Sequence, residues 1–149
     1  MAQSGAQNPN GLRKGACVIV RLTEDRITEL SKRAWAARDM SRILGKTKVG
    51  CAVLDERGSL YAGCNVEHRF RSHDIHAEVS AISAMVTAGG NELVAVFIAA
   101  EREKFTPCGA CLDWIFELGG GRCLVFSQAS PSAGTIRYTA LELMPHYPR

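Results

Sequence analysis

The chain has 149 residues, of which 46% are hydrophobic and 22% are charged, and its formal net charge is +3 at pH 7. This length suits one domain with its own core, and no apolar run approaches the roughly 20 residues that span a bilayer. The Lys and Arg residues are scattered among acidic residues, so we expect neither a membrane nor a nucleic acid as a partner.

The N-terminal segment 1–15 is polar, and the apolar piece that follows it, ACVIV, is too short for a secretory signal. We expect 1–15 to be a flexible tail, 16–149 to form a single domain, and the protein to be cytoplasmic. In a reducing compartment, the pair Cys108 and Cys111 indicates thiol or metal chemistry rather than a disulfide. The other cysteines are predicted to be small buried apolar residues: Cys17, Cys51, Cys64 and Cys123.

Apolar residues at helical spacing over 23–45 predict a first helix, which starts with acidic residues and ends at Gly45. Residues 48–68 contain two apolar runs joined by DERG, which is typical of a tight turn, and they predict a β-hairpin. The stretch HAEVSAISAM, 76–85, predicts a second helix with Asp74 as its N-cap. A pair of glycines beyond this stretch marks the end of the helix.

The continuous apolar run 93–100 predicts a central strand that is covered on both faces. A third helix is expected to begin at Pro107 and to end in three glycines. Segments 122–127 and 135–145 predict a further strand and then a last short strand or helix. This alternation predicts a layered α/β fold with helices on the faces of a sheet.

Two groups of reactive side chains lie at predicted helix starts, His76 with Glu78 and Cys108 with Cys111. In the first turn of a helix, two cysteines three residues apart lie on one side and can share an ion, and the helix N-terminus favours their thiolates. A redox dithiol has the same spacing and is the alternative. His76 could complete a Cys2His set, which for zinc leaves a fourth tetrahedral position for water.

Glu78 decides which chemistry this group of residues can perform. On an ideal helix it points about 200° away from His76, so it is a poor ligand, but in a first turn its side chain can lean over the helix end. A carboxylate beside a zinc-activated water can take its proton and pass it to a departing amine. The predicted chemistry is hydrolytic deamination, and the pattern H-x-E…P-C-x-x-C is a zinc deaminase signature.

The segments AGCNVEH, HAEVSAI and PCGAC resemble the cytidine deaminase family, over about residues 24–147. The resemblance implies a three-layer α/β/α fold, with a mixed sheet of about five strands and helices on both faces. It also implies that 16–149 is one catalytic domain with one Zn²⁺ per subunit. In this interpretation the metal ligands are His76, Cys108 and Cys111, and Glu78 is the catalytic residue.

The resemblance also implies a cytosine nucleoside as substrate, cytidine or deoxycytidine, converted to uridine or deoxyuridine and ammonia. Asn65 and Glu67 match the family's residues for the ribose 3′-hydroxyl, and Ala77 matches the backbone that contacts the ring edge of the base. An amide and a carboxylate can together donate to and accept from a hydroxyl group. A homo-oligomer is implied, with a tetramer favoured over a dimer, and pyrimidine salvage is the expected role.

Departures from the family pattern concern the walls of the base pocket. Thr47 stands where the family has an aromatic residue, Leu112 and Asp113 follow the second cysteine, and Tyr147 is the only aromatic near the C-terminal end. A modified nucleoside such as blasticidin S is therefore a further candidate substrate.

Two other functions remain open from the sequence. Deaminases of tRNA bases share HAE and PC-x-x-C, although Asn65, Glu67 and the weak net charge count against an RNA substrate. A non-catalytic zinc-binding module is the second alternative, in which Cys64 or His73 supplies a fourth ligand and closes the site.

Overall fold

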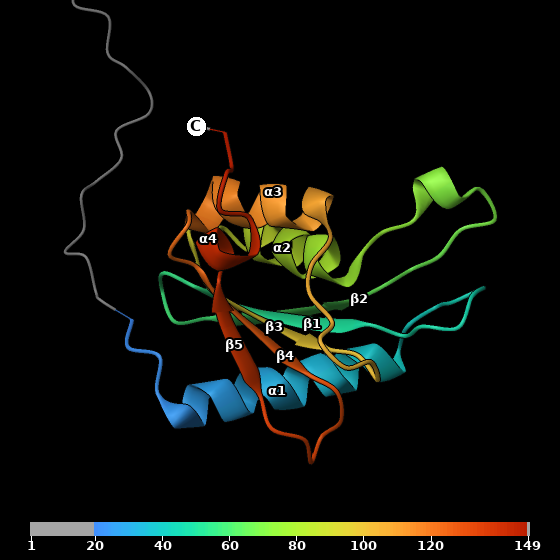
Figure 1. The fold of residues 1–149 in the computed structure, drawn as a ribbon, viewed down its shortest axis with the longest axis horizontal. Helices are drawn as coiled ribbons and strands as arrows, with labels where there is room; N and C mark the ends of the chain where they lie inside the picture. The colour runs from blue at the N-terminus through green and yellow to red at the C-terminus, as the bar shows by residue number, and fades with distance from the viewer. Residues whose placement is uncertain (1–19, 149) are drawn as a thin grey trace, which may run out of the picture.

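Five strands form one mixed sheet in the order β2-β1-β3-β4-β5 (Figure 1). The structure is a computed structural model and describes residues 20–148. β3 and β4 are parallel, and the other neighbouring pairs are antiparallel. The strands are β1 (Gly50–Asp55), β2 (Leu60–Cys64), β3 (Leu93–Ala99), β4 (Leu124–Gln128) and β5 (Ile136–Thr139). The predicted tail 1–15 and Cys17 lie outside the described residues.

The helix α1 (Glu24–Asp39) covers one face of the sheet (Figure 1). It begins after Thr23, whose side chain accepts a hydrogen bond from the Arg26 amide, and its buried residues pack on the inner strands. Gly50 permits this close approach, because a Cβ there would lie 1.9 Å from the Ala34 carbonyl oxygen. The cluster on this face comprises Leu30, Ala34, Ala52, Leu54, Ala95, Phe97, Ala99 and Phe126.

The first helix ends at Asp39 and not at Gly45 as predicted. The residues after it instead form backbone hydrogen bonds to the chain beyond β2. Arg42 donates to the Asn65 carbonyl and accepts from the Glu67 amide, at 3.2 and 2.8 Å. These contacts with a distant segment take the backbone groups that a longer helix would use, so the helical pattern of the sequence is overridden.

The opposite face of the sheet is covered by α2 (Ala77–Thr87), α3 (Gly109–Gly119) and the short α4 (Ala140–Leu143) (Figure 1). Alternate residues of β1 therefore serve different layers, with Ala52 in the α1 cluster and Cys51 in the α2 and α3 cluster. The predicted three-layer α/β/α arrangement is confirmed. The final segment, expected as a strand or a helix, contains both β5 and α4.

Three of the remaining cysteines can be compared with their predicted burial. Cys51 and Cys123 are buried, as expected, whereas Cys64 is only half-buried on the edge strand β2.

Within residues 20–148, no helix combines the length and apolar character needed to cross a membrane.

The N-cap of α2 is His76 and not Asp74 as predicted. Asp74 instead ends the short 3-10 helix η1 (Arg71–His73), and its carboxylate accepts from the His68 amide at 2.7 Å and pairs with Arg71 at 2.9 Å. The Asp74 carboxylate thus binds to residues of the preceding loop and is not available to cap α2. His76 takes the N-cap position instead.

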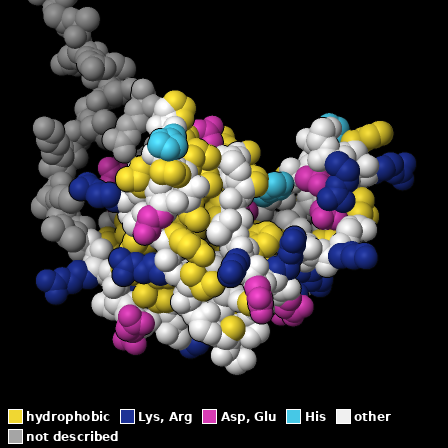
Figure 2. Space-filling model, viewed as in Figure 1, with side chains coloured by type: hydrophobic (Ala, Val, Ile, Leu, Met, Phe, Trp, Pro, Cys, Tyr) yellow, Lys and Arg dark blue, Asp and Glu magenta, His cyan; other side chains and the backbone are white. Residues whose placement is uncertain are grey.

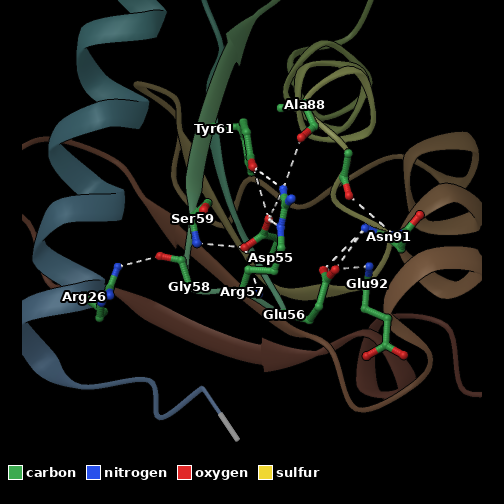
Figure 3. A network of polar contacts seen from close by, with 11 residues as sticks. Arg26, Asp55, Glu56, Arg57, Gly58, Ser59, Tyr61, Ala88, Asn91 and Glu92 are labelled. Carbon is green, nitrogen blue, oxygen red and sulfur yellow. Dashed lines mark hydrogen bonds and ion pairs between the residues drawn. The ribbon is translucent and has the colours of Figure 1, made fainter. Parts of the chain in front are cut away.

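A buried carboxylate fixes the turn between β1 and β2 (Figure 3). Asp55 is 0% exposed and accepts hydrogen bonds from the amides of Ser59 and Arg57, from the Arg57 guanidinium and from the Tyr61 hydroxyl, at 2.7 to 3.1 Å. Burial alone raises the pKa of a carboxyl group, but these hydrogen bonds outweigh it and hold the pKa of Asp55 below its ordinary value. The ionised Asp55 side chain therefore stabilises the turn of the hairpin.

Replacing this carboxylate tests its contribution to stability. Asp55→Asn is expected to lower the free energy of unfolding by about 1–3 kcal/mol at neutral pH, because the amide has one acceptor oxygen in place of two and the donors bonded to the other oxygen lose their acceptor. The folded-state pKa is lowered, so the stabilisation is present above the unfolded-state value of about 4 and is lost as the pH falls through the folded-state pKa.

Urea unfolding of wild type and Asp55→Asn measures both effects. The difference between the two proteins should be smaller near pH 3 than near pH 7, below and above the ordinary carboxyl pKa of about 4. Asp25→Asn, which changes an exposed acid on α1, is the control and should alter stability by no more than about 0.5 kcal/mol. An equal difference at both pH values would contradict the role given to the ionised carboxylate.

Candidate active site

The two predicted groups of reactive residues meet where α2 and α3 begin. His76 is the N-cap of α2 and Cys108 the N-cap of α3, each with an extended backbone. α3 therefore begins at Gly109 rather than at Pro107, and the Cys108 carbonyl accepts the first helical hydrogen bond, from Leu112 at 2.9 Å. The two N-cap side chains approach each other.

The three predicted metal ligands form one compact group of donor atoms. His76 Nδ1 lies 3.4 Å from the Sγ atoms of both Cys108 and Cys111, and all three donor atoms lie within 4.8 Å of one another. Tetrahedral zinc, with Zn–S near 2.3 Å and Zn–N near 2.05 Å, separates a nitrogen from a sulfur donor by about 3.5 Å. The spacing of these side chains therefore fits a zinc ion.

The chemistry of the donors fits zinc as well. Two cysteine sulfurs and an imidazole are the soft and borderline ligands that zinc prefers. Burial raises the pKa of the Cys111 thiol far above its usual range, and the nearby Glu78 carboxylate raises it further. A divalent cation reverses this preference because it stabilises the thiolate, so metal binding and deprotonation are linked here.

The group has three protein donors and is not closed by a fourth. His73 belongs to η1, where its Nδ1 lies 3.4 Å from Nδ1 of His68, and Cys64 is in β2. Neither belongs to the donor group, and no other His, Cys, Asp or Glu of residues 20–148 joins it. Three protein ligands are typical of catalytic rather than structural zinc sites. The contact of one imidazole with both sulfurs also favours a metal site over a dithiol.

Glu78 lies beside this group in the first turn of α2 and is only 3% exposed. The angle of about 200° expected for residues two apart on a helix does not apply, because His76 precedes the helix in extended conformation. Burial raises the pKa of Glu78 above its ordinary value. A buried carboxyl group next to a metal site can act as a general base and as a general acid in turn.

One pocket of about 280 Å³ connects the metal donors to the predicted sugar-binding residues. Its size is near the lower end of ligand pockets, roughly 300 Å³. It opens beside the segment that carries η1, which projects from the body of the protein with basic and acidic side chains gathered on it (Figure 2). The predicted site residues that line it are Asn65, Glu67, His76, Ala77, Glu78 and Cys108, whereas Cys111 is buried behind the surface.

Asn65 lines the pocket while it holds the chain that enters β1. Its Oδ1 accepts from the Val49 amide at 2.8 Å, and its Nδ2 donates to the Thr47 carbonyl at 3.0 Å. A side-chain amide has two N–H donors and two acceptor lone pairs. One donor and one lone pair therefore remain for a ligand.

Glu67 is 8% exposed and is fastened to the same loop. Its carboxylate accepts from the Leu44 and Gly45 amides at 2.6 and 2.7 Å and forms a two-point ion pair with Arg71 at 3.0 Å. The Gly45 amide, the Arg71 guanidinium and the Leu44 amide lower the pKa of Glu67 to about 2. Oε2 takes three of these donors and Oε1 takes one, so Oε1 keeps capacity for one more.

The comparisons with known proteins agree with this site. Residues 23–127 match the family model described as the cytidine and deoxycytidylate deaminase zinc-binding region. The chain belongs to the cytidine and deoxycytidylate deaminase family. The cytidine deaminase of Sporosarcina psychrophila is 32% identical over 102 residues, which cover 67% of this chain and 75% of that protein. The family predicted from the sequence is thus confirmed.

Two crystal structures of cytidine deaminases have the same fold as this deaminase. That from Mycobacterium leprae is 32% identical with a TM-score of 0.68, over 79% of this chain and 96% of that one. That from Burkholderia pseudomallei is 27% identical with a TM-score of 0.73, over 84% and 98% of the two chains. The match to nearly the whole length of both structures indicates that the sheet and its helices form the deaminase core.

Several pocket residues of this deaminase were missed by the sequence analysis because they belong to no motif. Arg71 follows Glu67 by four residues, and Phe105 precedes Cys108 by three, so proximity to the motifs was the only available indication. Thr47, identified only as a departure from the family, lines the pocket. The further lining residues are Val49, Arg71, Asp74, Ile75, Arg102, Phe105 and Thr106.

Metal binding by this deaminase can be measured through stability. After zinc is stripped with a chelator, Zn²⁺ added at about 100 times its Kd should raise the free energy of unfolding by about 2.7 kcal/mol. Cys111→Ser should lose most of this gain, whereas Cys64→Ser, which changes a free cysteine outside the donor group, should keep it. Thermal unfolding with and without Zn²⁺, together with metal analysis, provides the readout. An undiminished zinc-dependent shift in Cys111→Ser would contradict the assigned ligands.

Proposed function

We propose that this protein catalyses the zinc-dependent hydrolytic deamination of a cytosine nucleoside, cytidine or deoxycytidine, to the uracil nucleoside and ammonia. The observation that carries the proposal is the position of the buried Glu78 beside the donor group of His76, Cys108 and Cys111, in a pocket that Asn65 also lines. Membership of the family supports the same reaction.

The chain's own residues account for the movement of protons in this reaction. Zinc bound by His76, Cys108 and Cys111 supplies Lewis-acid activation of water near neutral pH. Glu78, when ionised, accepts a proton from the attacking water and, when protonated, delivers it to the substrate. One water is consumed, the bond from the ring carbon to the exocyclic amine breaks, and ammonia leaves while a carbonyl forms. Burial raises the pKa of Glu78 and so favours the protonated form that the delivery step needs.

The rest of the pocket binds and orients the nucleoside. Ala77 is the first residue of α2, and the N–H groups of a first helical turn have no partner within the helix, so the Ala77 backbone donates to the ring edge. The remaining donor and lone pair of Asn65 and the free capacity of Glu67 Oε1 face the sugar hydroxyls. Because these side chains also hold the loop before β1, sugar binding and loop position depend on the same groups.

The central experiment is an assay for cytidine deamination with zinc-loaded protein, followed by ultraviolet absorbance and ammonia release. Glu78→Gln keeps the shape of the side chain but cannot move a proton, so kcat should fall by about 10²- to 10⁴-fold with zinc content unchanged. Glu92→Gln, an exposed acid beside the β1–β2 turn, is the matched control and should keep wild-type kcat. Full activity in zinc-loaded Glu78→Gln would exclude the proposed proton shuttle.

The role of Asn65 in sugar binding can be separated from its role in holding the loop. Asn65→Ala should raise KM for cytidine by about 5- to 20-fold, the loss expected for one hydrogen bond. For 3′-deoxycytidine the same substitution should have a much smaller effect, because the hydroxyl partner is already absent. Steady-state kinetics on both substrates measures the coupling energy between the Asn65 side chain and the 3′-hydroxyl group. Equal losses on the two substrates would show that Asn65 acts only through the loop.

The proposal also covers the zinc stoichiometry, the oligomeric state and the cellular role of the protein. One zinc ion per subunit follows from the single donor group of the described residues. A homo-oligomer, with a tetramer favoured over a dimer, is in accord with large exposed apolar side chains on the two loops beside the pocket, Met40 and Leu44 on one and Phe70 and Ile75 on the other. A cytoplasmic role in pyrimidine salvage belongs to the same proposal, and a modified nucleoside such as blasticidin S stays a further candidate substrate.

A further inference from the structure

The loop from β3 to α3 forms one wall of the pocket and leads to the metal donor Cys108. Few polar contacts hold this loop. Among the hydrogen bonds and ion pairs of residues 20–148, only the pair between Glu101 and Arg38 joins residues 101–107 to another segment of the chain. The position of this wall therefore depends on that pair and on apolar packing.

Arg38 lies at the edge of the sheet from which the loop leaves. It belongs to the last turn of α1, and it packs on Gly50, where a Cβ would lie 2.8 Å from the Cβ of Arg38. Gly50 is paired with Cys64 and with Ala99, the last residues of β2 and β3. The helix on the face opposite α2 and α3 thus places a cation at the edge where the candidate active site forms.

The Arg38 side chain is buried and has one close acidic partner. It is 12% exposed, and its guanidinium carbon lies 5.3 Å from the centre of the Trp35 ring. Its Nη2 lies 2.9 Å from Oε2 of Glu101, whereas the Asp39 carboxylate is 3.6 Å from Nη1. A buried cation needs a paired carboxylate to offset its loss of hydration. Because Glu101 is 67% exposed, the buried arginine sets the position of the glutamate rather than the reverse.

A second contact connects the start of the loop to α1. The Ala100 amide donates to the Gln128 carbonyl at 3.3 Å, and Oε1 of Gln128 accepts from Nε1 of Trp35 at 2.7 Å. Trp35 is also the ring over which the Arg38 guanidinium lies. The helix α1 therefore holds the first two residues of the loop through one group of side chains.

Beyond these two residues the backbone bends sharply. The Arg102 amide donates to the Ala100 carbonyl at 2.7 Å, which closes a three-residue turn. Lys104 has φ of 52° and is the only non-glycine residue with a positive φ between residues 20 and 148. Non-glycine residues keep this conformation where surrounding contacts impose it. The direction in which the chain leaves Glu101 therefore determines where the pocket-lining residues of the loop lie.

We propose that Arg38 is a positioning residue for substrate binding, because its ion pair with Glu101 fixes the loop from β3 to α3 as a wall of the pocket. The inference rests on the proposed function, since it concerns the nucleoside bound in the same pocket. Neither Arg38 nor Glu101 lines the pocket, and α3 is held by its own buried side chains. Loss of the pair should therefore weaken nucleoside binding and leave the zinc donors in place.

The test removes the charge of the exposed partner. Glu101→Gln keeps the size of the side chain and should raise KM for cytidine by about 3- to 10-fold, within the range of couplings between residues in contact. The kcat and the zinc content should be unchanged. Glu103→Gln is the matched control, because it changes an exposed acid of the same loop that has no ion pair within residues 20–148. It should keep the wild-type KM.

A double-mutant cycle shows whether the effect passes through Arg38. In an Arg38→Met background, Glu101→Gln should cause no further rise in KM, because its partner is already absent. Arg38→Lys keeps a cation and should raise KM less than Arg38→Met. A lower free energy of unfolding with a wild-type KM in Glu101→Gln would show that the pair serves stability alone. That result would overturn the inference, even if Arg38→Met fails to fold.

A readout without catalysis separates this inference from the proposed function. If the zinc-loaded wild type forms no uridine from cytidine, the proposed function fails. Amide hydrogen exchange of residues 101–106 still reports the order of the loop. Faster exchange in Glu101→Gln than in wild type and Glu103→Gln supports the positioning role, and equal exchange in all three proteins overturns it.

Discussion

The direction of two strands determines where this protein can perform chemistry. β2 and β3 are both antiparallel to β1, so they run in the same direction, and their carboxyl ends lie at the same edge of the sheet. Beyond each of these ends the chain leads through a loop to a helix, α2 or α3, and His76 and Cys108 are the N-caps of these helices. The donor group forms because both helices begin at one edge and both N-caps have an extended backbone. A close approach of α2 to β2 is part of this arrangement, since a Cβ at Gly63 would lie 2.4 Å from the Ala81 nitrogen.

Burial controls the electrostatics of the site. Glu78 and Cys111 are both excluded from solvent, and this exclusion raises the pKa of each group. Burial disfavours the charged form of each group, whereas a bound divalent ion stabilises the thiolate. Metal binding, deprotonation of the Cys111 thiol and protonation of the Glu78 carboxyl group are therefore coupled. The buried strands β1 and β3 supply the rigid support on which such a site depends.

On the opposite side of the pocket, the polar side chains of Asn65 and Glu67 hold the loop before β1 in place. Glu67 is kept ionised by two backbone amides and by Arg71, and Asn65 bridges two backbone groups of the loop before β1. Polar side chains of this kind are rigid, because each one has several partners that limit its motion. They place the loop and present only a small remaining hydrogen-bonding capacity to the pocket. In the proposed function, a sugar hydroxyl meets groups that are already in position, which lowers the ordering cost of binding.

The sequence by itself determined the elements with strong local patterns and the residues of the candidate metal site. The hairpin turn, the buried strand β3 and the pattern H-x-E with P-C-x-x-C depend on residue type and short spacing, which are properties of the chain alone. Only the tertiary structure decided that α1 ends at Asp39, that His76 rather than Asp74 caps α2, and that Phe105 lines the pocket. The end of α1 depends on contacts between segments far apart in the chain, those of the Arg42 backbone with Asn65 and Glu67, whereas Asp74 is engaged by His68 and Arg71 of the loop before α2. Local preferences are worth only a few tenths of a kcal/mol to about 1 kcal/mol per residue, so contacts of this kind override them.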